Sequence, residues 1–297
     1  MPSPTRRLAL SLGITLVFVV VEVIAGFLAN SLVLLTDAAH NFTDVLALAL
    51  TWWALYVTTK PAHSGKTYGY HRAGILVALV NSTTLALIAI GIFYEAYRRF
   101  VAPPEVRADL LIGVGLAAVV VNLVTALLVR RGAERDLNLK SAFLHLMGDV
   151  ISTLGAVVAG IVIHFTGWNW LDPLVGMLIG FLILWNAWGI VRESVDILME
   201  ATPTDIDMDA LIGDICSVEG VRGVHDLHVW SITQSMRNLS AHLVTDDVTL
   251  SAGAKIQAAV GALLAEKYGL AHATLQLEYA ECANNGLYCD VSTNHVY

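Results

Sequence analysis

Charged residues are scarce in this chain. Only 14% of its 297 residues are charged, whereas 56% are hydrophobic, and the mean hydropathy is +0.67. Soluble globular domains carry about 25% charged residues, so this composition excludes an ordinary soluble protein and indicates one that contacts a lipid bilayer. Acidic residues outnumber basic ones by 25 to 17, and the resulting net charge of −8 argues against nucleic acid as a partner.

Cysteine and several catalytic motifs are also scarce or absent. The chain contains three cysteines, Cys216, Cys282 and Cys289, all in a region expected to face the cytoplasm, where thiols stay reduced. A disulfide framework is therefore not expected. The motifs GxxxxGK[ST] and GxGxxG do not occur, which argues against transport driven by ATP hydrolysis on this chain. The HExxH motif is missing too, so an intramembrane zinc-dependent hydrolase is the weakest of the alternatives and the chain is not expected to be an enzyme.

What the chain does contain is a set of long apolar runs within its first 200 residues. They cover residues 8–28, 32–57, 73–97, 108–129, 142–164 and 172–191. Each approaches or exceeds the ~20 residues that a helix needs to cross the hydrocarbon, so we predict an all-α domain of six transmembrane helices. The first run has spanning length and contains Glu22, and we interpret it as a span and not as a cleaved signal peptide.

The basic residues between these runs predict the orientation of the helices. Most lie in segments on one side of the predicted membrane, while the other side holds only Arg98, Arg99 and Arg107. Under the positive-inside rule, this distribution places both termini in the cytoplasm. We therefore expect a multi-pass protein of the inner (plasma) membrane.

From residue 203 the pattern changes to short elements. Helical spacing over 205–218 is followed by strands over 223–232 and 237–245, a helix over 251–268 and a strand over 272–280. This αββαβ order predicts an α+β domain with helices on one face of a small sheet. We divide the chain into a transmembrane domain (1–202), a small α+β domain (203–281) and a tail (282–297).

Two motifs with the same spacing, one in the second span and one in the fifth, provide candidate metal ligands. They are His40 with Asp44 and His145 with Asp149. Residues four apart share one face of a helix, and two such pairs supply the two imidazoles and two carboxylates of a tetrahedral Zn²⁺ site. An ionised Asp in the membrane costs roughly 2.5–3.5 kcal/mol on insertion scales, so such acids are usually functional. The alternatives are two unrelated helix–helix hydrogen bonds, or a membrane metal sensor that does not transport.

Other polar residues in the spans have simpler interpretations. Asp37 lies one turn before His40 on the same helix face. Two interpretations stay open for it: an acid on the path of the ion or of protons, or a simple hydrogen-bonded acid. For the remaining groups, interhelical hydrogen bonding is the preferred interpretation. These are Glu22, Asn81, Asn122 and Asn186.

The soluble region contains a second group of candidate ligands. His225, His242 and Glu278 fall on adjacent predicted strands and form a possible cytoplasmic metal site, the alternative being ordinary sheet residues. For His228 we prefer that alternative. In the tail, Cys282 and Cys289 have a spacing looser than that of compact zinc knuckles, which makes them a weak signal for a metal site.

The chain resembles the cation diffusion facilitators, in particular bacterial zinc exporters similar to the eukaryotic vesicular zinc transporters. Five segments carry the resemblance, which covers nearly the whole chain. They are Ser31–Asp44 (SLVLLTDAAHNFTD), Tyr68–Arg72 (YGYHR), Ala142–Asp149 (AFLHLMGD), His225–Trp230 (HDLHVW) and Ala273–Glu278 (ATLQLE). The paired HxxxD motifs are the most specific of them.

This resemblance implies a homodimer of six-helix protomers with ferredoxin-like cytoplasmic domains, which exports Zn²⁺ in exchange for H⁺. It assigns the transport site to the two HxxxD pairs, and the histidine at position 40 favours zinc over Cd²⁺, with Co²⁺ as a further candidate ion. Because ligands must lose their protons before they bind a metal, protons and zinc compete for the same groups, and this competition is sufficient for antiport.

The sequence departs from its relatives in one loop. Some family members bind a second ion between spans two and three, where this chain has His63, Lys66 and Tyr70. Lysine and tyrosine are poor zinc ligands at neutral pH. Occupancy of that loop is therefore not expected, although His63 and His71 could form a weaker variant.

Overall fold

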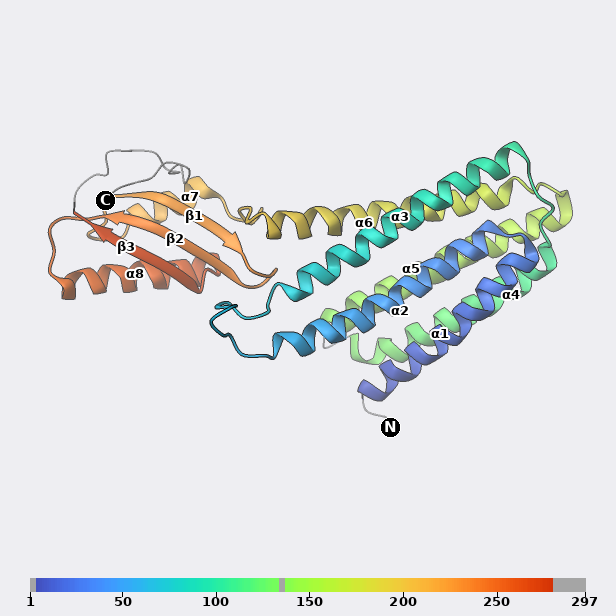
Figure 1. The fold of residues 1–297 in the computed structure, drawn as a ribbon, viewed down its shortest axis with the longest axis horizontal. Coiled ribbons are helices and arrows are strands. Elements are labelled where there is room, and N and C mark those ends of the chain that lie inside the picture. Colours follow the sequence, from blue (N-terminus) through green and yellow to red (C-terminus); the bar gives the residue numbers. More distant parts are fainter. Residues whose placement is uncertain (1–3, 134–136, 280–297) are drawn as a thin grey trace. The chain divides into compact units, whose positions relative to one another are not determined.

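The computed structural model describes residues 4–133 and 137–279, with side chains described for 13–127 and 143–279. Six long helices come first, and a smaller α+β region follows (Figure 1). The long helices are α1 (Pro4–Ala29), α2 (Leu32–Thr58), α3 (Ala73–Val101), α4 (Ala108–Ala133), α5 (Leu137–Thr166) and α6 (Leu171–Leu198). The later elements are α7 (Met208–Cys216), β1 (Gly223–Ser231), β2 (Arg237–Val244), α8 (Leu250–Tyr268) and β3 (His272–Glu278).

The described residues form two compact units. One comprises the described parts of Met1–Tyr56 and Val77–Val191, and the other those of Val57–Leu76 and Arg192–Tyr297. The second unit thus combines the C-terminal domain with the loop between α2 and α3 and the last turns of α6. The division of the chain at residue 202 stays a prediction.

The six helices coincide with the six predicted apolar runs. Within the residues whose side chains are described, α2 to α6 are long and apolar enough to span a membrane, and the described part of α1, Gly13–Ala29, is an apolar helix segment. Large apolar side chains such as Trp52, Leu87 and Trp185 are exposed on the helix surfaces. A water-soluble protein would bury such residues, whereas lipid covers them in a membrane.

Helices α4 and α5 approach each other closely because small residues lie between them. A Cβ placed at Gly115 of α4 would be 2.8 Å from Cγ2 of Val157, and one at Gly160 of α5 would be 3.0 Å from Leu111. Association of helices in lipid depends on such close packing, since apolar contact alone gives no advantage over lipid. The pair therefore positions α5, which carries one of the two HxxxD motifs.

The start of α2 is fixed by a buried acid from α6. Oδ1 of Asp172 accepts a hydrogen bond from the Ser31 hydroxyl at 2.5 Å, and its Oδ2 accepts one from the Leu32 backbone N–H at 2.6 Å. The Arg99 guanidinium lies 3.7 Å from the same carboxylate and donates to the Asn30 carbonyl. A carboxylate at a helix N-terminus satisfies free N–H groups and interacts favourably with the helix dipole.

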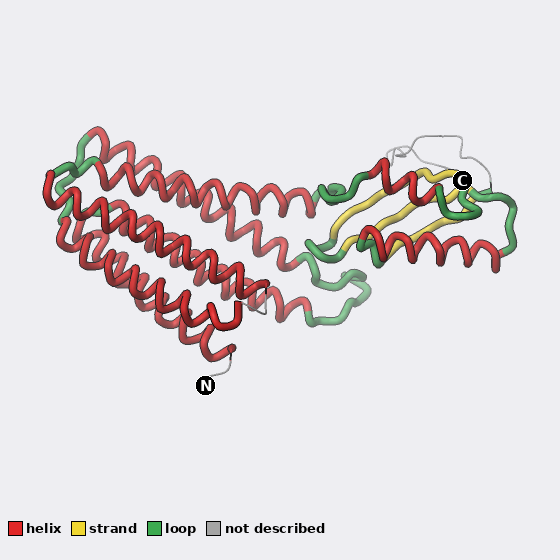
Figure 2. Tube along the Cα trace, turned by 180° about the vertical axis from the view of Figure 1, so that it is seen from behind, coloured by secondary structure: helices red, strands yellow, loops and turns green. Residues whose placement is uncertain are grey.

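The C-terminal domain has the predicted αββαβ order. Its sheet has the strand order β1–β2–β3, in which β1 pairs antiparallel with β2, and β2 pairs parallel with β3. Helices α7 and α8 lie on the same side of the sheet (Figure 2), and their apolar residues share one core with the strands. The core includes Leu211, Val260 and Leu264 from the helices and Leu227, Leu239 and Leu243 from the strands.

We predict that an Asp172→Ala change destabilises the helical domain. It leaves buried N–H and hydroxyl donors without an acceptor, at a cost of roughly 1–3 kcal/mol each. The melting temperature of the detergent-solubilised protein should fall. Asp109→Ala is the matched control because Asp109 is 86% exposed, and equal melting temperatures for the two variants would contradict this role.

Candidate metal centres

The first centre lies between α2 and α5, where the two HxxxD motifs face each other. Nε2 of His40 is 3.7 Å from Asp44 Oδ2 and 3.3 Å from Asp149 Oδ1. Nε2 of His145 is 3.0 Å from Asp44 Oδ2 and 3.9 Å from Asp149 Oδ2. Each imidazole therefore lies near one carboxylate of its own helix and one of the other helix. The contacts between the helices join His40 to Asp149, 109 positions apart, and Asp44 to His145, 101 positions apart.

These distances fit a small tetrahedral cation. Zinc binds His nitrogen and carboxylate oxygen at ~2.0–2.2 Å, which places the ligand atoms of a tetrahedron roughly 3.4 Å apart. The four N–O distances above lie between 3.0 and 3.9 Å, and each residue offers a ligand atom within 4.8 Å of the others. The cluster can close around one ion without a large movement of the helices.

The ligands of this centre differ in exposure. The Asp149 side chain is 9% exposed, whereas that of His145 is 49% exposed. The cluster is thus accessible on the His145 side and enclosed on the Asp149 side. Nδ1 of His40 is buried and has no hydrogen-bond partner among the described residues.

A network of buried polar groups adjoins the centre. The Thr153 hydroxyl of α5 lies 3.4 Å from Asp37 Oδ2 and also donates to the backbone carbonyl of Asp149 at 2.8 Å. Glu22 of α1 is fully buried and accepts a hydrogen bond from the Asn41 amide at 3.1 Å. Its carboxyl group and that of Asp37 are within hydrogen-bonding reach of each other. The sequence indicated polar contacts for Glu22 but not that its partner is an acid.

The second centre lies on the sheet face opposite α7 and α8. The Glu278 carboxylate contacts two imidazoles, with Oε2 2.9 Å from His225 Nε2 and Oε1 3.0 Å from His242 Nδ1. The two rings are edge to face, with centroids 5.1 Å apart. Two nitrogens and a carboxylate make three ligands, so a tetrahedral ion here would keep a fourth position open.

A β-bulge in β1 makes this cluster possible. His225 pairs with His242 and His228 pairs with Ser240, so that Asp226 and Leu227 together oppose a single residue of β2. Asp226 has a φ of +48°, which a bulge can accommodate. Strict alternation would turn His225 toward the same side as Leu227, which is in the core. The bulge turns it to the opposite face instead.

Asp226 is a residue near this cluster that the sequence analysis missed. Its Oδ2 is 3.6 Å from His242 Nε2, and its Oδ1 is 3.1 Å from His228 Nε2. His228 thus contacts Asp226 and lies outside the three-residue cluster. The only sequence signal for Asp226 was its place between two histidines, because an alternating strand pattern does not predict a bulge.

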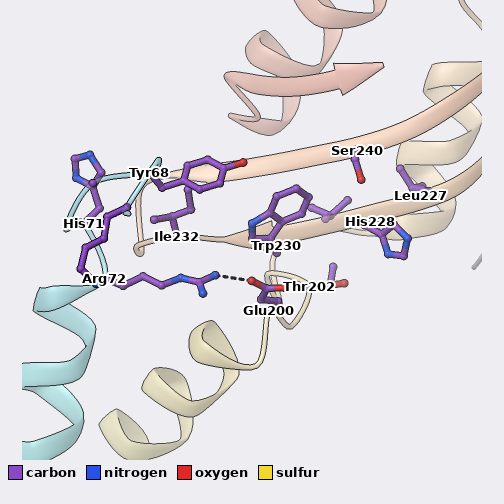
Figure 3. Close-up of a pocket in the computed structure, with 13 residues that line it drawn as sticks. Tyr68, His71, Arg72, Glu200, Thr202, Leu227, His228, Trp230, Ile232 and Ser240 are labelled. Carbon is purple, nitrogen blue, oxygen red and sulfur yellow. Dashed lines mark hydrogen bonds and ion pairs between the residues drawn. The ribbon is translucent and has the colours of Figure 1, made fainter. Parts of the chain in front are cut away.

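The loop between α2 and α3 does not gather a comparable set of ligands. His63 Nε2 is 3.2 Å from the Tyr70 hydroxyl, and the Lys66 ammonium lies over the Tyr70 ring. A cavity of about 710 Å³ lies between this loop and the sheet. The His71 and His228 side chains are at opposite ends of the group drawn in Figure 3, where Arg72 pairs with Glu200 at 2.9 Å. Cys282 and Cys289 lie outside the described residues.

Comparison with known proteins identifies the family. Residues 8–199 match the family model "Cation efflux transmembrane domain", and residues 203–280 match "Cation efflux protein, cytoplasmic domain". The chain belongs to the cation efflux, or cation diffusion facilitator, family. Members of this family are metal cation transporters and not enzymes. The chain is therefore a multi-pass membrane protein whose C-terminal α+β domain is the cytoplasmic domain of a cation efflux protein.

Several relatives of this cation efflux protein have names that state their cargo. The "Cadmium, cobalt and zinc/H(+)-K(+) antiporter" of Bacillus subtilis is 38% identical over 276 residues, covering 92% of this chain and 88% of the relative. The "Zinc transporter ZitB" of Yersinia pseudotuberculosis is 35% identical, covering 94% and 89%. A solved structure, the metal-bound C-terminal domain of the CzcD transporter from Cupriavidus metallidurans, is 29% identical. It covers 25% of this chain and 99% of that domain, with a TM-score of 0.23.

We predict that zinc stabilises the isolated cytoplasmic domain, residues 203–297, whose described part has a core of its own. A ligand present at 100 times its Kd stabilises the folded state by about 2.7 kcal/mol, and His242→Ala should remove most of that gain. Thermal melting with and without zinc measures the effect.

The matched control is His272→Ala, because His272 opens β3 and lies outside the three-residue cluster. It should keep the zinc-dependent shift. Replacing Cys282 and Cys289 by serine should cause a smaller loss than His242→Ala. A melting temperature that zinc does not change, or a shift that survives His242→Ala, would contradict a metal site on the sheet.

Proposed function

We propose that this cation efflux protein exports Zn²⁺ from the cytoplasm in exchange for protons, by alternating access at a site made of His40, Asp44, His145 and Asp149. The observation that carries the proposal is the approach of four nitrogen and oxygen ligand atoms, two from α2 and two from α5, to separations suited to one tetrahedral ion. The names of the zinc-transporting relatives support zinc as the cargo, and cadmium and cobalt are further candidates.

Charge explains how such a site can carry a dication through the membrane. Two ionised carboxylates neutralise Zn²⁺, which lowers the cost of placing the ion among apolar helices. With the ion absent, the same carboxylates keep an electrostatic partner only if the imidazoles are protonated. Metal and protons therefore replace each other with little change in net charge at the site.

The exchange follows from the chemistry of the ligands. Zinc binds deprotonated imidazole, so binding from the cytoplasm releases protons from His40 and His145. When the site faces the other side, protons compete for these imidazoles and release the ion. Histidine titrates in the physiological range, so modest differences in pH suffice to drive the cycle. The "zinc/H(+)-K(+) antiporter" name of one relative supports this coupling.

A closed ligand shell separates transport from the alternatives. A hydrolytic zinc site keeps one position open for water, whereas four protein ligands fill a tetrahedral shell. A sensor would need only the ligands of the cytoplasmic domain. Four ligands inside the helical domain favour a transporter over both.

The cytoplasmic domain is proposed to regulate and to dimerise the protein. We infer a ferredoxin-like fold from its αββαβ order and its mixed sheet. We infer a homodimer from the presence of the cytoplasmic domain of the cation efflux family. The cluster of His225, His242 and Glu278 would bind regulatory zinc there. We further propose that the domains divide at residue 202, that both termini lie in the cytoplasm and that the inner (plasma) membrane is the site of action.

We predict that Asp149→Ala abolishes zinc transport but leaves an assembled protein, because it removes one of four ligands without changing the cytoplasmic domain. Mutations of groups that only support a ligand already cost 10–100-fold in metal affinity, so zinc flux into inside-out vesicles should fall to background. Asp44→Ala should behave in the same way, and Asp109→Ala, at an exposed position, should retain flux. Near-normal flux in Asp149→Ala would rule out the four-ligand site.

We predict that His40→Asp shifts the preference from zinc toward cadmium. The change keeps four potential ligands but replaces a rigid imidazole with a smaller carboxylate, which relaxes the constraint on ion size. The measurement is the ratio of Zn²⁺ to Cd²⁺ flux in the same vesicles, which should decrease relative to the wild type. An unchanged ratio would count against His40 as a determinant of selectivity.

A further inference from the structure

Two acidic side chains outside the four-ligand site meet inside the helical domain. Glu22 of α1 has an exposed fraction of 0%, and Asp37 of α2 has one of 4%. Their carboxyl groups are within hydrogen-bonding reach of each other. Neither residue is among the four candidate ligands of the transport site.

The surroundings of this pair supply too few donors for two carboxylates. Oε2 of Glu22 accepts a hydrogen bond from Asn41, but its Oε1 is buried and has no partner among the described residues. Asp37 has the Thr153 hydroxyl at 3.4 Å, and that hydroxyl also donates to the Asp149 carbonyl at 2.8 Å. A buried carboxylate oxygen without a donor is costly, whereas a shared proton would satisfy both acids at once.

In the described part of the chain, no lysine or arginine side chain acts as a partner of the pair. The polar side chains around Asp37 are those of Glu22 of α1, His40 of α2, and Asp149 and Thr153 of α5. The neighbour from α4 is the neutral Asn122, whose amide nitrogen is 3.4 Å from the Thr153 hydroxyl. Two adjacent carboxyl groups in such a setting do not both ionise, and they bind a proton as a unit.

We propose that Glu22 and Asp37 form a proton-binding site that is separate from the metal ligands, and that its shared proton is one of those exchanged for the metal ion. This inference rests on the proposed function as an antiporter. It assigns to α1, which contributes none of the four candidate ligands of the transport site, a direct part in proton coupling.

The position of the pair explains how metal and proton would affect each other. Asp37 is one turn from His40, and Thr153 links it to Asp149, because the Thr153 hydroxyl lies 3.4 Å from Asp37 Oδ2 and donates to the Asp149 carbonyl at 2.8 Å. A dication bound at the four-ligand site therefore favours the ionised pair over the protonated pair. It thereby promotes release of the shared proton. By reciprocity, a proton on the pair weakens metal binding by the same factor.

The test counts protons released per zinc bound. Zinc binding to the purified full-length protein is measured by calorimetry in buffers of different ionisation enthalpy, from which the proton count follows. Glu22→Gln keeps the size of the side chain and can still contact Asn41, and it should release about one proton fewer per zinc. The zinc stoichiometry should stay that of the wild type.

Two further variants make the result specific. Glu95→Gln makes the same chemical change in α3, where Glu95 pairs with Arg98 and Arg99 away from the network, and it should leave the proton count unchanged. Asp37→Asn removes the other carboxyl group of the pair and serves as the test if Glu22→Gln does not fold. In infrared difference spectra, zinc should abolish a protonated-carboxyl band in the wild type, and that band should be missing from both variants of the pair.

The outcomes separate this inference from the proposed function. If Glu22→Gln or Asp37→Asn binds zinc and releases as many protons as the wild type, the pair is a structural contact and the inference is wrong. Loss of zinc binding in both folded variants would also overturn it, because the acids would then act on the ion itself. Failure of the proposed function would appear instead in the wild type, as zinc binding without zinc flux or without proton release.

Discussion

Carboxylates among apolar helices need a partner, and the helical domain meets this need in three different ways. Asp172 uses the free N–H groups at the start of α2 together with a nearby guanidinium. Asp44 and Asp149 each face imidazoles from both α2 and α5. Glu22 has another acid as its neighbour. The first arrangement fixes the fold, while the other two leave room for exchange, because imidazoles and paired carboxyl groups gain and lose protons whereas backbone amides do not.

This difference assigns tasks to the helices. Asp172 anchors the N-terminus of α2 to α6, and close contact at small residues joins α4 to α5. The ligands of the candidate transport site are divided between α2 and α5, so a change in the relative position of these helices would alter the site itself. Alternating access requires such a dependence, since the ion must lose its contact with one side of the membrane before it gains contact with the other.

The two candidate metal centres differ in ways that suit different roles. The one in the helical domain has two carboxylates, which neutralise a divalent ion, and four ligands, which close the shell. The one on the sheet has a single carboxylate and three ligands, so a bound dication would keep a positive charge and an open position. Asp226 lies 3.6 Å from His242 at the edge of this second centre. A neutral, closed site suits a cargo in transit, whereas a charged, open site suits a contact that depends on the metal.

The sequence determined what depends on neighbours along the chain. Apolar runs predicted six helices, residues at i and i+4 placed each His with its Asp on one helix face, and alternating patterns predicted the αββαβ order, because periodicity and propensity are local properties. Tertiary structure decided which faces meet. It brought α2 against α5, placed Glu22 beside Asp37, and set Asp172 at the start of α2. The bulge that places His225 beside His242 also depends on tertiary structure. It forms where β1 pairs with β2, and it allows Leu227 to be buried in the core while His225 lies on the opposite face.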